Sequence, residues 1–258
     1  MSRFNNLEFG NEADGESPLH RSELKGEEYY FGEARAAFEN GNFEQGLRLY
    51  SKVLEFNPDN AAAWTGQVRM LIELGEFHEA KLWADKALER FSHEPELLAA
   101  KAVALGREGD LQGALAFSDA SIEERGDTPY VWLARADVLL ARRESRADFC
   151  FQKALLLAPA NWFVAWLAAR IHYYYRRFAM ALKLLQQAIE WNTSHFLLWL
   201  ELGRCQEGLG LIGPARTSFS RARELNAQCH DAQAALTQLS GTGFGRQARA
   251  LWRRLFKR

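Results

Sequence analysis

The chain has few cysteines, no long apolar run and almost no net charge, and each of these features excludes a class of protein. Its cysteines, Cys150, Cys205 and Cys229, are widely spaced and form no CxxC motif, which predicts reduced, buried thiols rather than a disulfide framework. No apolar run approaches the roughly 20 residues needed to span a bilayer, and the first residues do not resemble a signal peptide. We therefore expect a cytoplasmic protein. The formal net charge of −1 provides no bulk attraction to nucleic acid, which makes a nucleic-acid partner an unfavoured prediction.

Arrangements of residues that carry out chemistry are also missing. The six histidines form no HExxH motif and no pair with metal-ligand spacing. The segment GTGFGR at 241–246 lacks the Lys-Ser/Thr of a phosphate-binding loop, and Arg246 stands where a dinucleotide fingerprint needs glycine. No nucleophile is accompanied by a base. We therefore predict no catalytic residue, no metal site and no cofactor.

The chain does contain a repeat of helical hairpins. In the copy at 61–94, Trp64, Val68 and Leu71 share one face of a first helix. Gly75 ends that helix, and alanines line one face of a second helix, where they let the two helices approach closely. Five copies are 34 residues long and the fourth is one residue shorter. The repeats run 27–60, 61–94, 95–128, 129–161, 162–195 and 196–229. A period of this length is typical of a solenoid.

These features resemble the tetratricopeptide repeat (TPR) family. The period, the small–small–large pattern and the closing "NP" and "AP" dipeptides match it over about four-fifths of the chain. The resemblance implies an all-α fold, namely a right-handed superhelical solenoid of six TPR hairpins. The match is poorer at two places. Arg143 stands where a turn glycine belongs, in a loop that is one residue short, which predicts a kink there, and Ser118 replaces a common aromatic.

Three further segments are predicted around the repeats. Residues 1–26 are acidic, rich in Gly, Ser and Asn, and aperiodic, which predicts disorder. Residues 230–240 are expected to form a helix that caps the last repeat. Residues 241–258 are predicted to be a glycine hinge followed by a basic amphipathic helix.

The first helices of the repeats are expected to line a concave groove. One repeated position holds Arg35, Arg69, Val103, Asp137, Arg170 and Arg204. Neighbouring positions in the later repeats add Tyr130, Phe163, Trp166, Tyr173 and Tyr174. Tyr, Trp and Arg dominate interface hot spots, and a guanidinium binds a carboxylate through two hydrogen bonds. These residues predict a site for an extended or helical peptide with acidic and bulky apolar side chains. The alternative is that the aromatic residues belong to the core.

The family's known clamp for a peptide carboxylate is not expected here, since it uses an asparagine. The corresponding early positions hold Phe31, Arg35, Thr65 and Arg69 instead.

The basic tail is a second candidate interaction surface. Its apolar stripe is surrounded by cations with no acid present. The predicted interacting residues are Arg249, Leu251, Trp252, Arg253, Leu255 and Phe256. Such a helix can cap the solenoid, dock on a protein partner or lie on an anionic membrane, and the sequence leaves these three alternatives open.

The pattern as a whole predicts a non-catalytic adaptor or assembly factor that binds a partner peptide in its groove. Two alternatives come from other functional classes. One is an RNA-binding helical repeat of the pentatricopeptide sort, in which hairpins of about 35 residues read one base each. The other is a peripheral regulatory module of a membrane complex, which rests on the tail alone. Partner identity and oligomeric state stay open.

Overall fold

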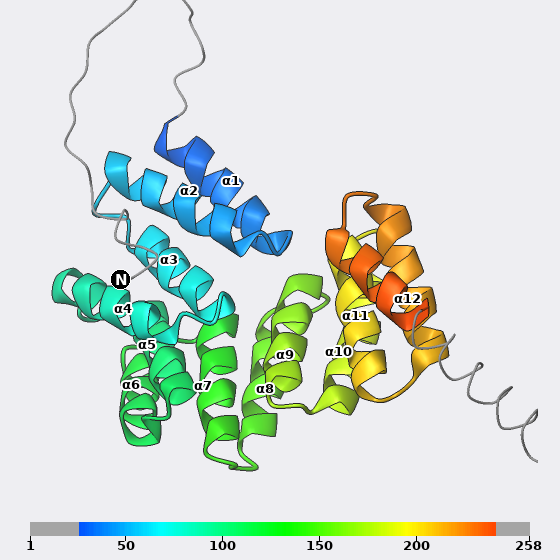
Figure 1. Cartoon of the computed structure of the whole chain (residues 1–258). Helices are drawn as coiled ribbons and strands as arrows, with labels where there is room; N and C mark the ends of the chain where they lie inside the picture. Colours follow the sequence, from blue (N-terminus) through cyan, green and yellow to red (C-terminus); the bar gives the residue numbers. More distant parts are fainter. Residues whose placement is uncertain (1–25, 241–258) are drawn as a thin grey trace, which may run out of the picture. The chain divides into compact units, whose positions relative to one another are not determined.

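The computed structural model of the chain describes residues 26–240, and every regular element within them is an α-helix (Figure 1). The helices are α1 (Glu27–Glu39), α2 (Phe43–Phe56), α3 (Ala61–Glu73), α4 (Phe77–Arg90), α5 (Pro95–Glu108), α6 (Leu111–Glu123), α7 (Pro129–Ala141), α8 (Ala147–Leu157), α9 (Trp162–Tyr174), α10 (Phe178–Trp191), α11 (Phe196–Gly208) and α12 (Ile212–Leu225). The prediction of an all-α helical repeat is confirmed. The segments 1–25 and 241–258, with the tail residues named above, lie outside the described residues.

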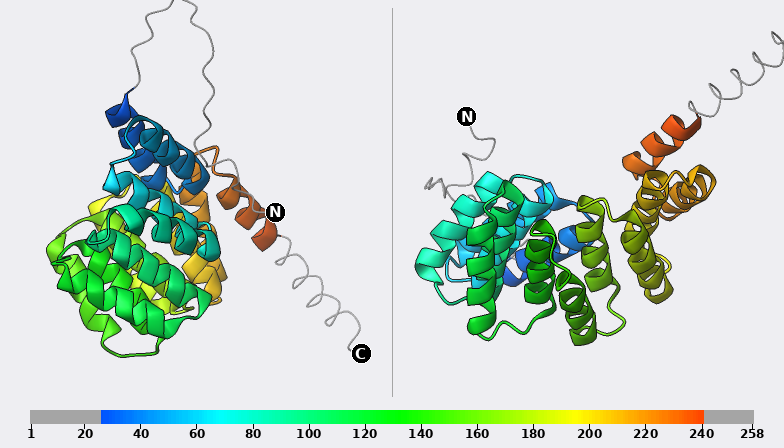
Figure 2. Two further views of the ribbon diagram at one scale, coloured as in Figure 1. Left: turned by 90° about the vertical axis from the view of Figure 1, so that its left-hand side faces the viewer. Right: turned by 90° about the horizontal axis from the view of Figure 1, so that it is seen from below.

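Successive helices form antiparallel hairpins (Figure 2). Small side chains are buried on the second helix of the hairpins. On α4, Ala80, Ala84 and Ala87 have no exposed surface. Equivalent small residues, Ala114 on α6 and Ala188 on α10, are also fully buried. Burial of apolar surface contributes roughly 25 cal/mol per Å², and one hairpin cannot bury its faces alone. The stability of each hairpin therefore depends on its neighbours.

The turns inside the hairpins adopt a left-handed backbone conformation. Gly41, Gly75, Gly109 and Gly210 have φ between 72° and 100°. Glycine adopts this conformation without the steric penalty that a Cβ introduces. The fourth and fifth hairpins have Arg143 and Arg176 at the same turn position, with φ of 60° and 57°. The repeat thus keeps the turn geometry even where the sequence lacks glycine.

Several helix starts are fixed by local chemistry. The side chains of Asn60, Asp110, Thr128 and Asn161 accept hydrogen bonds from backbone N–H groups in the first turns of α3, α6, α7 and α9. Such caps contribute about 1 kcal/mol each. Proline stands in the first turn of α5 and of α7, where its missing N–H leaves no helical hydrogen bond unmade.

The chain divides into two compact units at the Cys150–Phe151 bond, inside α8. The first unit contains α1 to α7 and the start of α8, and the second contains the rest of α8 and α9 to α12. The turn before α8 is irregular, since α8 begins four residues after Arg143 whereas α4 begins two residues after Gly75. The two units are treated separately below, and the kink predicted at this turn stays a prediction.

Residues 230–240 form a helix that packs on α12. Its apolar residues Ala232 and Leu239 are buried. Arg223 donates a hydrogen bond to the side-chain oxygen of Gln233 at 3.1 Å, and Arg216 donates one to the backbone oxygen of Leu239 at 3.4 Å. The order of these contacts shows that the helix runs antiparallel to α12.

Candidate functional site

The ten residues predicted to line one groove are divided between the two units. Arg35, Arg69, Tyr130 and Asp137 belong to the first unit. Phe163, Trp166, Arg170, Tyr173, Tyr174 and Arg204 belong to the second. Each set is therefore a separate candidate surface.

Arg69 of α3 is the centre of the first set. Its guanidinium carbon lies 3.8 Å from the ring centroid of Tyr130 on α7 and 4.9 Å from that of Phe38 on α1. A cation over an aromatic ring is stabilised by roughly 0.5–2 kcal/mol. Tyr130 also packs on the small apolar residues of α5 and α7, and burial raises its pKa, so that its hydroxyl stays neutral. Arg69 is thus held in one position by rings from two other helices.

Arg35 of α1 extends this surface, whereas Tyr50 of α2 is 4% exposed and supports it from the core. The ring of Tyr50 stands edge-on to Phe31, with 5.9 Å between the centroids. Burial raises the pKa of Tyr50, and the positive charges of Arg69 and Arg35 partly oppose that shift. Arg35 itself is exposed. We call Phe31, Arg35, Phe38, Tyr50, Arg69 and Tyr130 the arginine–aromatic patch. Phe38 and Tyr50 are its buried members, and a ligand can reach the other four.

Gly66 allows the tyrosine to take this position. A Cβ on Gly66 would lie 2.5 Å from Cζ of Tyr50, closer than real side-chain contacts. The ring therefore occupies space that any other residue at position 66 would fill. Because Gly66 has no side chain, α2 and α3 can approach each other closely at this point.

The two guanidiniums of the patch are not neutralised by acids in contact with them. Within residues 26–240, neither Arg35 nor Arg69 forms an ion pair or a hydrogen bond to a carboxylate. Glu39 and Glu73 follow them one helical turn later, so the patch is bordered by negative charge. An incoming carboxylate can therefore bind the cations without first displacing an internal partner, which lowers the free-energy cost of binding.

Asp137, also predicted to face the groove, is instead part of a buried ion pair. Arg107 of α5 donates to both of its carboxylate oxygens, at 3.0 Å from Nε and 2.5 Å from Nη2. The Asp137 side chain is 4% exposed. This pair links α5 to α7, and the prediction that Asp137 contacts a ligand is wrong, because the carboxylate is enclosed.

In the second unit the predicted arginines already hold a carboxylate. Arg170 of α9 and Arg204 of α11 both donate to Oε1 of Glu201, at 3.0 and 3.1 Å. Arg204 also binds Asp231 at 2.6 Å. Burial opposes the charge on Arg204, but Glu201 and Asp231 outweigh it and raise its pKa. These two acids balance the two cations, so Arg170 and Arg204 are not vacant for a ligand carboxylate.

The aromatic residues of the second unit differ in accessibility. Trp166 is fully buried, with Phe163 stacked on it at 5.3 Å, so the prediction that Trp166 faces a ligand is wrong. Tyr173 is half-buried against Phe178, while Tyr174 at the end of α9 is 45% exposed. Large side chains next to a helix terminus reach solvent more easily than those at the middle of a packed face.

Sequence reasoning missed Glu201, Phe38, Tyr50 and Arg107. Glu201 had a usable signal, because it is an acid within the otherwise apolar stretch FLLWLEL, and a buried acid needs a cationic partner. Phe38 and Tyr50 gave no such signal, since their rings obey the same apolar periodicity as the rest of the core.

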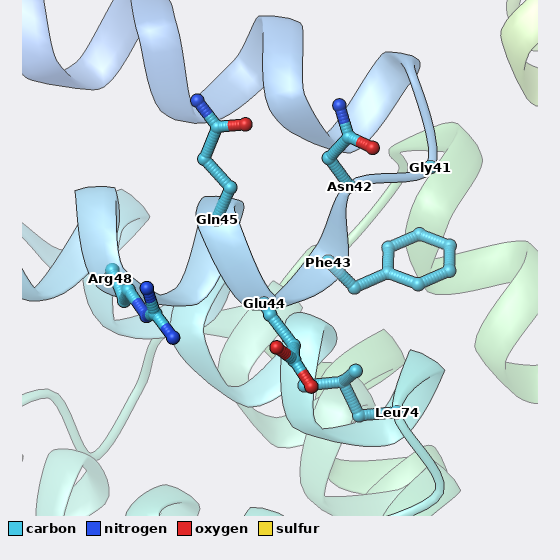
Figure 3. Close-up of a pocket in the computed structure, with 7 residues that line it drawn as sticks. All are labelled: Gly41, Asn42, Phe43, Glu44, Gln45, Arg48 and Leu74. Carbon is cyan, nitrogen blue, oxygen red and sulfur yellow. The ribbon is translucent and has the colours of Figure 1, made fainter. Parts of the chain in front are cut away.

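The structure also has an open cleft, shown in Figure 3, which adjoins the arginine–aromatic patch where Phe43 packs edge-on against Phe38 with 6.1 Å between the ring centroids. It has a volume of about 480 Å³ and lies at the start of α2, beside Leu74. Its remaining lining residues are Gly41, Asn42, Phe43, Glu44, Gln45 and Arg48. This wide, polar-rimmed cleft lacks the converging aromatic rings of the arginine–aromatic patch.

The structure between residues 26 and 240 contains no cluster of metal-ligating side chains. In the same stretch no helix combines the length and the apolarity needed to span a bilayer.

The described residues form an array of helical hairpins, which places the protein in the class of helical-repeat proteins. A sequence profile of the tetratricopeptide repeat matches residues 14–161, which is more than half of the chain, and the protein belongs to this family. The fold of the family supports protein–protein interaction and peptide binding. No curated protein sequence matches the chain significantly.

Two solved structures, TTC0263 and human IFIT1, show the same fold at low sequence identity. TTC0263, a thermophilic TPR protein of Thermus thermophilus, is 14% identical with a TM-score of 0.51, over 83% of this chain and 98% of that one. Human IFIT1, solved as a dimer with m7Gppp-AAAA, is 17% identical with a TM-score of 0.51, over 89% of this chain and 60% of that one. YrrB, a TPR protein with an unusual peptide-binding site, is 16% identical with a TM-score of 0.42. The match covers 72% of this chain and 96% of that one.

Proposed function

We propose that the protein is a non-catalytic adaptor that binds a peptide segment of a partner protein at the arginine–aromatic patch of its first unit. One observation supports this most directly. Arg69 is held between two aromatic rings while its hydrogen-bond donors have no carboxylate partner within residues 26–240. A positioned guanidinium loses little conformational entropy when it binds a carboxylate. The ligand is a peptide with an acidic side chain beside a bulky apolar one.

The centre of the proposed site is Arg69 of the first unit. The sequence had instead favoured Arg170 and Arg204, which belong to the second unit. There, a ligand carboxylate must compete with Glu201 for Arg170 and Arg204. Breaking a partly buried pair leaves a charge uncompensated, which is unfavourable. At Arg35 and Arg69 the same carboxylate meets no such competitor, so binding is expected to be stronger in the first unit.

A peptide selection on the full chain tests this proposal. A displayed random-peptide library should yield sequences enriched in Asp or Glu next to aromatic or large aliphatic residues. Calorimetry with one selected synthetic peptide should show roughly tenfold to hundredfold weaker binding for Arg69→Gln, because a hydrogen bond to a charged group contributes about 1.5–3 kcal/mol.

Arg48→Gln is the matched control, since Arg48 is an exposed arginine of α2 that lies outside the patch. Its Kd should equal that of the parent chain. Equal affinity of the parent and Arg69→Gln for the selected peptides would refute the patch as the binding site.

Single-stranded RNA is the alternative ligand class, and filter binding distinguishes it from a peptide. Filter binding at low salt should show no tight retention of RNA by the parent chain. Tight, salt-sensitive retention that survives removal of residues 241–258 would identify an RNA-binding repeat instead, because RNA affinity depends on phosphate contacts that release counterions.

A further inference from the structure

The two compact units of the chain carry net charges of opposite sign. Between residues 26 and 150 the first unit has 14 Lys and Arg against 23 Asp and Glu, a formal net charge of −9. Between residues 151 and 240 the second unit has 9 Lys and Arg against 5 Asp and Glu, a formal net charge of +4. Surfaces of opposite charge steer proteins toward each other and disfavour partners of the same charge. The second unit is therefore electrostatically complementary to the first unit of another copy of the chain.

Large apolar side chains protrude from the second unit at its two hairpin turns. Phe178, at the start of α10, packs against Gly208 at the end of α11, where a Cβ would lie 3.0 Å from its ring. The two turns are therefore neighbours. We call the exposed residues around them the basic turn edge, namely Tyr174, Arg176, Met180, Leu209 and Leu211. Its four apolar members are between 39% and 45% exposed, and an exposed apolar patch with a polar border is typical of an interaction site.

The equivalent turns of the first unit have a recess instead of protruding apolar side chains. At its three glycine turns no large apolar side chain is exposed to the same degree. The open cleft of Figure 3 lies between the first two of these turns, and the Glu44 side chain extends toward Leu74 there. Glu76 follows Leu74 by two residues, and Arg48 is the cation among the lining residues. We call this cleft together with Glu76 the acidic cleft.

The basic turn edge and the acidic cleft are complementary in size and in charge. The cleft, at about 480 Å³, is within the range of pockets that bind ligands, and it is large enough for a leucine side chain. Burial of an exposed leucine in it would remove apolar surface from water. Neither Arg176 nor Glu76 has a side-chain ion pair within residues 26–240, so each is available to the other.

We propose that two copies of the chain form a dimer in which the basic turn edge of each copy docks on the acidic cleft of the other. Leu211 enters the cleft beside Leu74, and Arg176 pairs with Glu76 at its border. Because each chain has one surface of each kind, the contact is made twice and the assembly closes with two-fold symmetry. A second copy is the favoured occupant, because it supplies both the negative charge and the recess that the basic turn edge lacks.

Sedimentation equilibrium of the full chain without peptide tests the proposal independently of peptide binding. With rising concentration the parent should reach the mass of two chains, and added salt should favour single chains because it screens the charges. Arg176→Glu and Glu76→Arg should each weaken self-association at least about tenfold, since like charges then face each other at both contacts. Their equimolar mixture should restore the dimer, because a mixed pair has one native and one reversed ion pair.

Each charge reversal has a matched control. Arg125→Glu matches Arg176→Glu, since Arg125 is also an exposed arginine with a left-handed backbone, at φ 61° against 57°. Glu89→Arg matches Glu76→Arg, because Glu89 is an exposed glutamate of α4, the helix that follows Glu76. Both controls should associate as the parent does.

The apolar part of the contact is tested separately. Leu211→Ser should weaken self-association, whereas Leu82→Ser, which changes an exposed leucine of α4, should not. A parent chain with the mass of one chain at every concentration would overturn the proposal. Unchanged self-association of Arg176→Glu and Leu211→Ser would also overturn it, as would a mixture of the two charge-reversed chains that stays monomeric while circular dichroism shows both to be helical.

Discussion

At the scale of single residues, Glu201 shows how one carboxylate determines what a pair of arginines can do. Its side chain is 5% exposed and lies between Arg170 and Arg204, whose side chains are 22% and 34% exposed. The acid joins α9 to α11, and it removes both cations from the set available to a ligand. Arg69 occupies the same position of its repeat but has no carboxylate partner within residues 26–240, so it remains available to bind a ligand.

Glu201→Gln should destabilise the protein by about 2 kcal/mol. The amide keeps the shape of the side chain but loses the charge that two partly buried guanidiniums share, and removing one member of such a pair is unfavourable. Urea unfolding followed by circular dichroism measures the change in the free energy of unfolding.

Glu224→Gln provides the comparison, since Glu224 is 62% exposed and pairs with Arg221 on the surface of α12. Its effect should stay within about 0.5 kcal/mol. Equal effects of the two substitutions would contradict the structural role assigned to Glu201.

At the scale of elements, the hairpin turn is the part of the repeat that tolerates least variation in backbone conformation. Four turns use glycine at positive φ, and two achieve the same conformation with arginine. For a residue with a Cβ, this conformation costs roughly 1–2 kcal/mol. The fourth and fifth hairpins therefore fold with strain that the others avoid.

Arg143→Gly should stabilise the chain by about 0.5–1 kcal/mol, because relief of the left-handed strain exceeds the added backbone entropy of the unfolded state. Gly75→Ala should destabilise it by about 1 kcal/mol for the converse reason. At Gly75 no atom lies within 4 Å of an added Cβ, so steric contact cannot account for the effect. Chemical denaturation measures both, and effects of the same sign would contradict the conformational explanation.

At the scale of the whole molecule, the stability of a repeat array is the sum of its repeats and their nearest-neighbour contacts. The division of the chain into two compact units adds a boundary across which perturbations should weaken. A local change should therefore alter backbone protection mostly within its own unit.

Hydrogen exchange in Gly75→Ala should be faster in α3 and α4 and in the helices packed on them, while exchange in α9 to α12 should match that of the parent chain. Mass spectrometry of peptic fragments resolves this difference. A uniform increase over both units would show that the hairpins unfold together as one cooperative structure.

The architecture of this protein follows largely from local patterns, and this is why the sequence predicted it. Helical periodicity, the glycines after each first helix and the alanines of each second helix act over a few residues, so their spacing alone specifies repeated helical hairpins. The loop at Arg143 was predicted to be one residue short, and this is wrong: residues 142–146 separate α7 from α8, whereas only 74–76 separate α3 from α4. The shortening of the fourth repeat falls in α8, which has 11 residues against 14 in α4.

The sequence by itself therefore determined the helical repeat, the positions of its turns and the kind of side chain along each first helix. Only the tertiary structure decided which of those side chains are available to a ligand. Arg170 and Glu201 are 31 residues apart in the sequence, and Arg107 and Asp137 are 30 residues apart. Arg69 of the second hairpin contacts Tyr130 of the fourth. Such pairings depend on distances and side-chain directions between helices, which no local periodicity encodes.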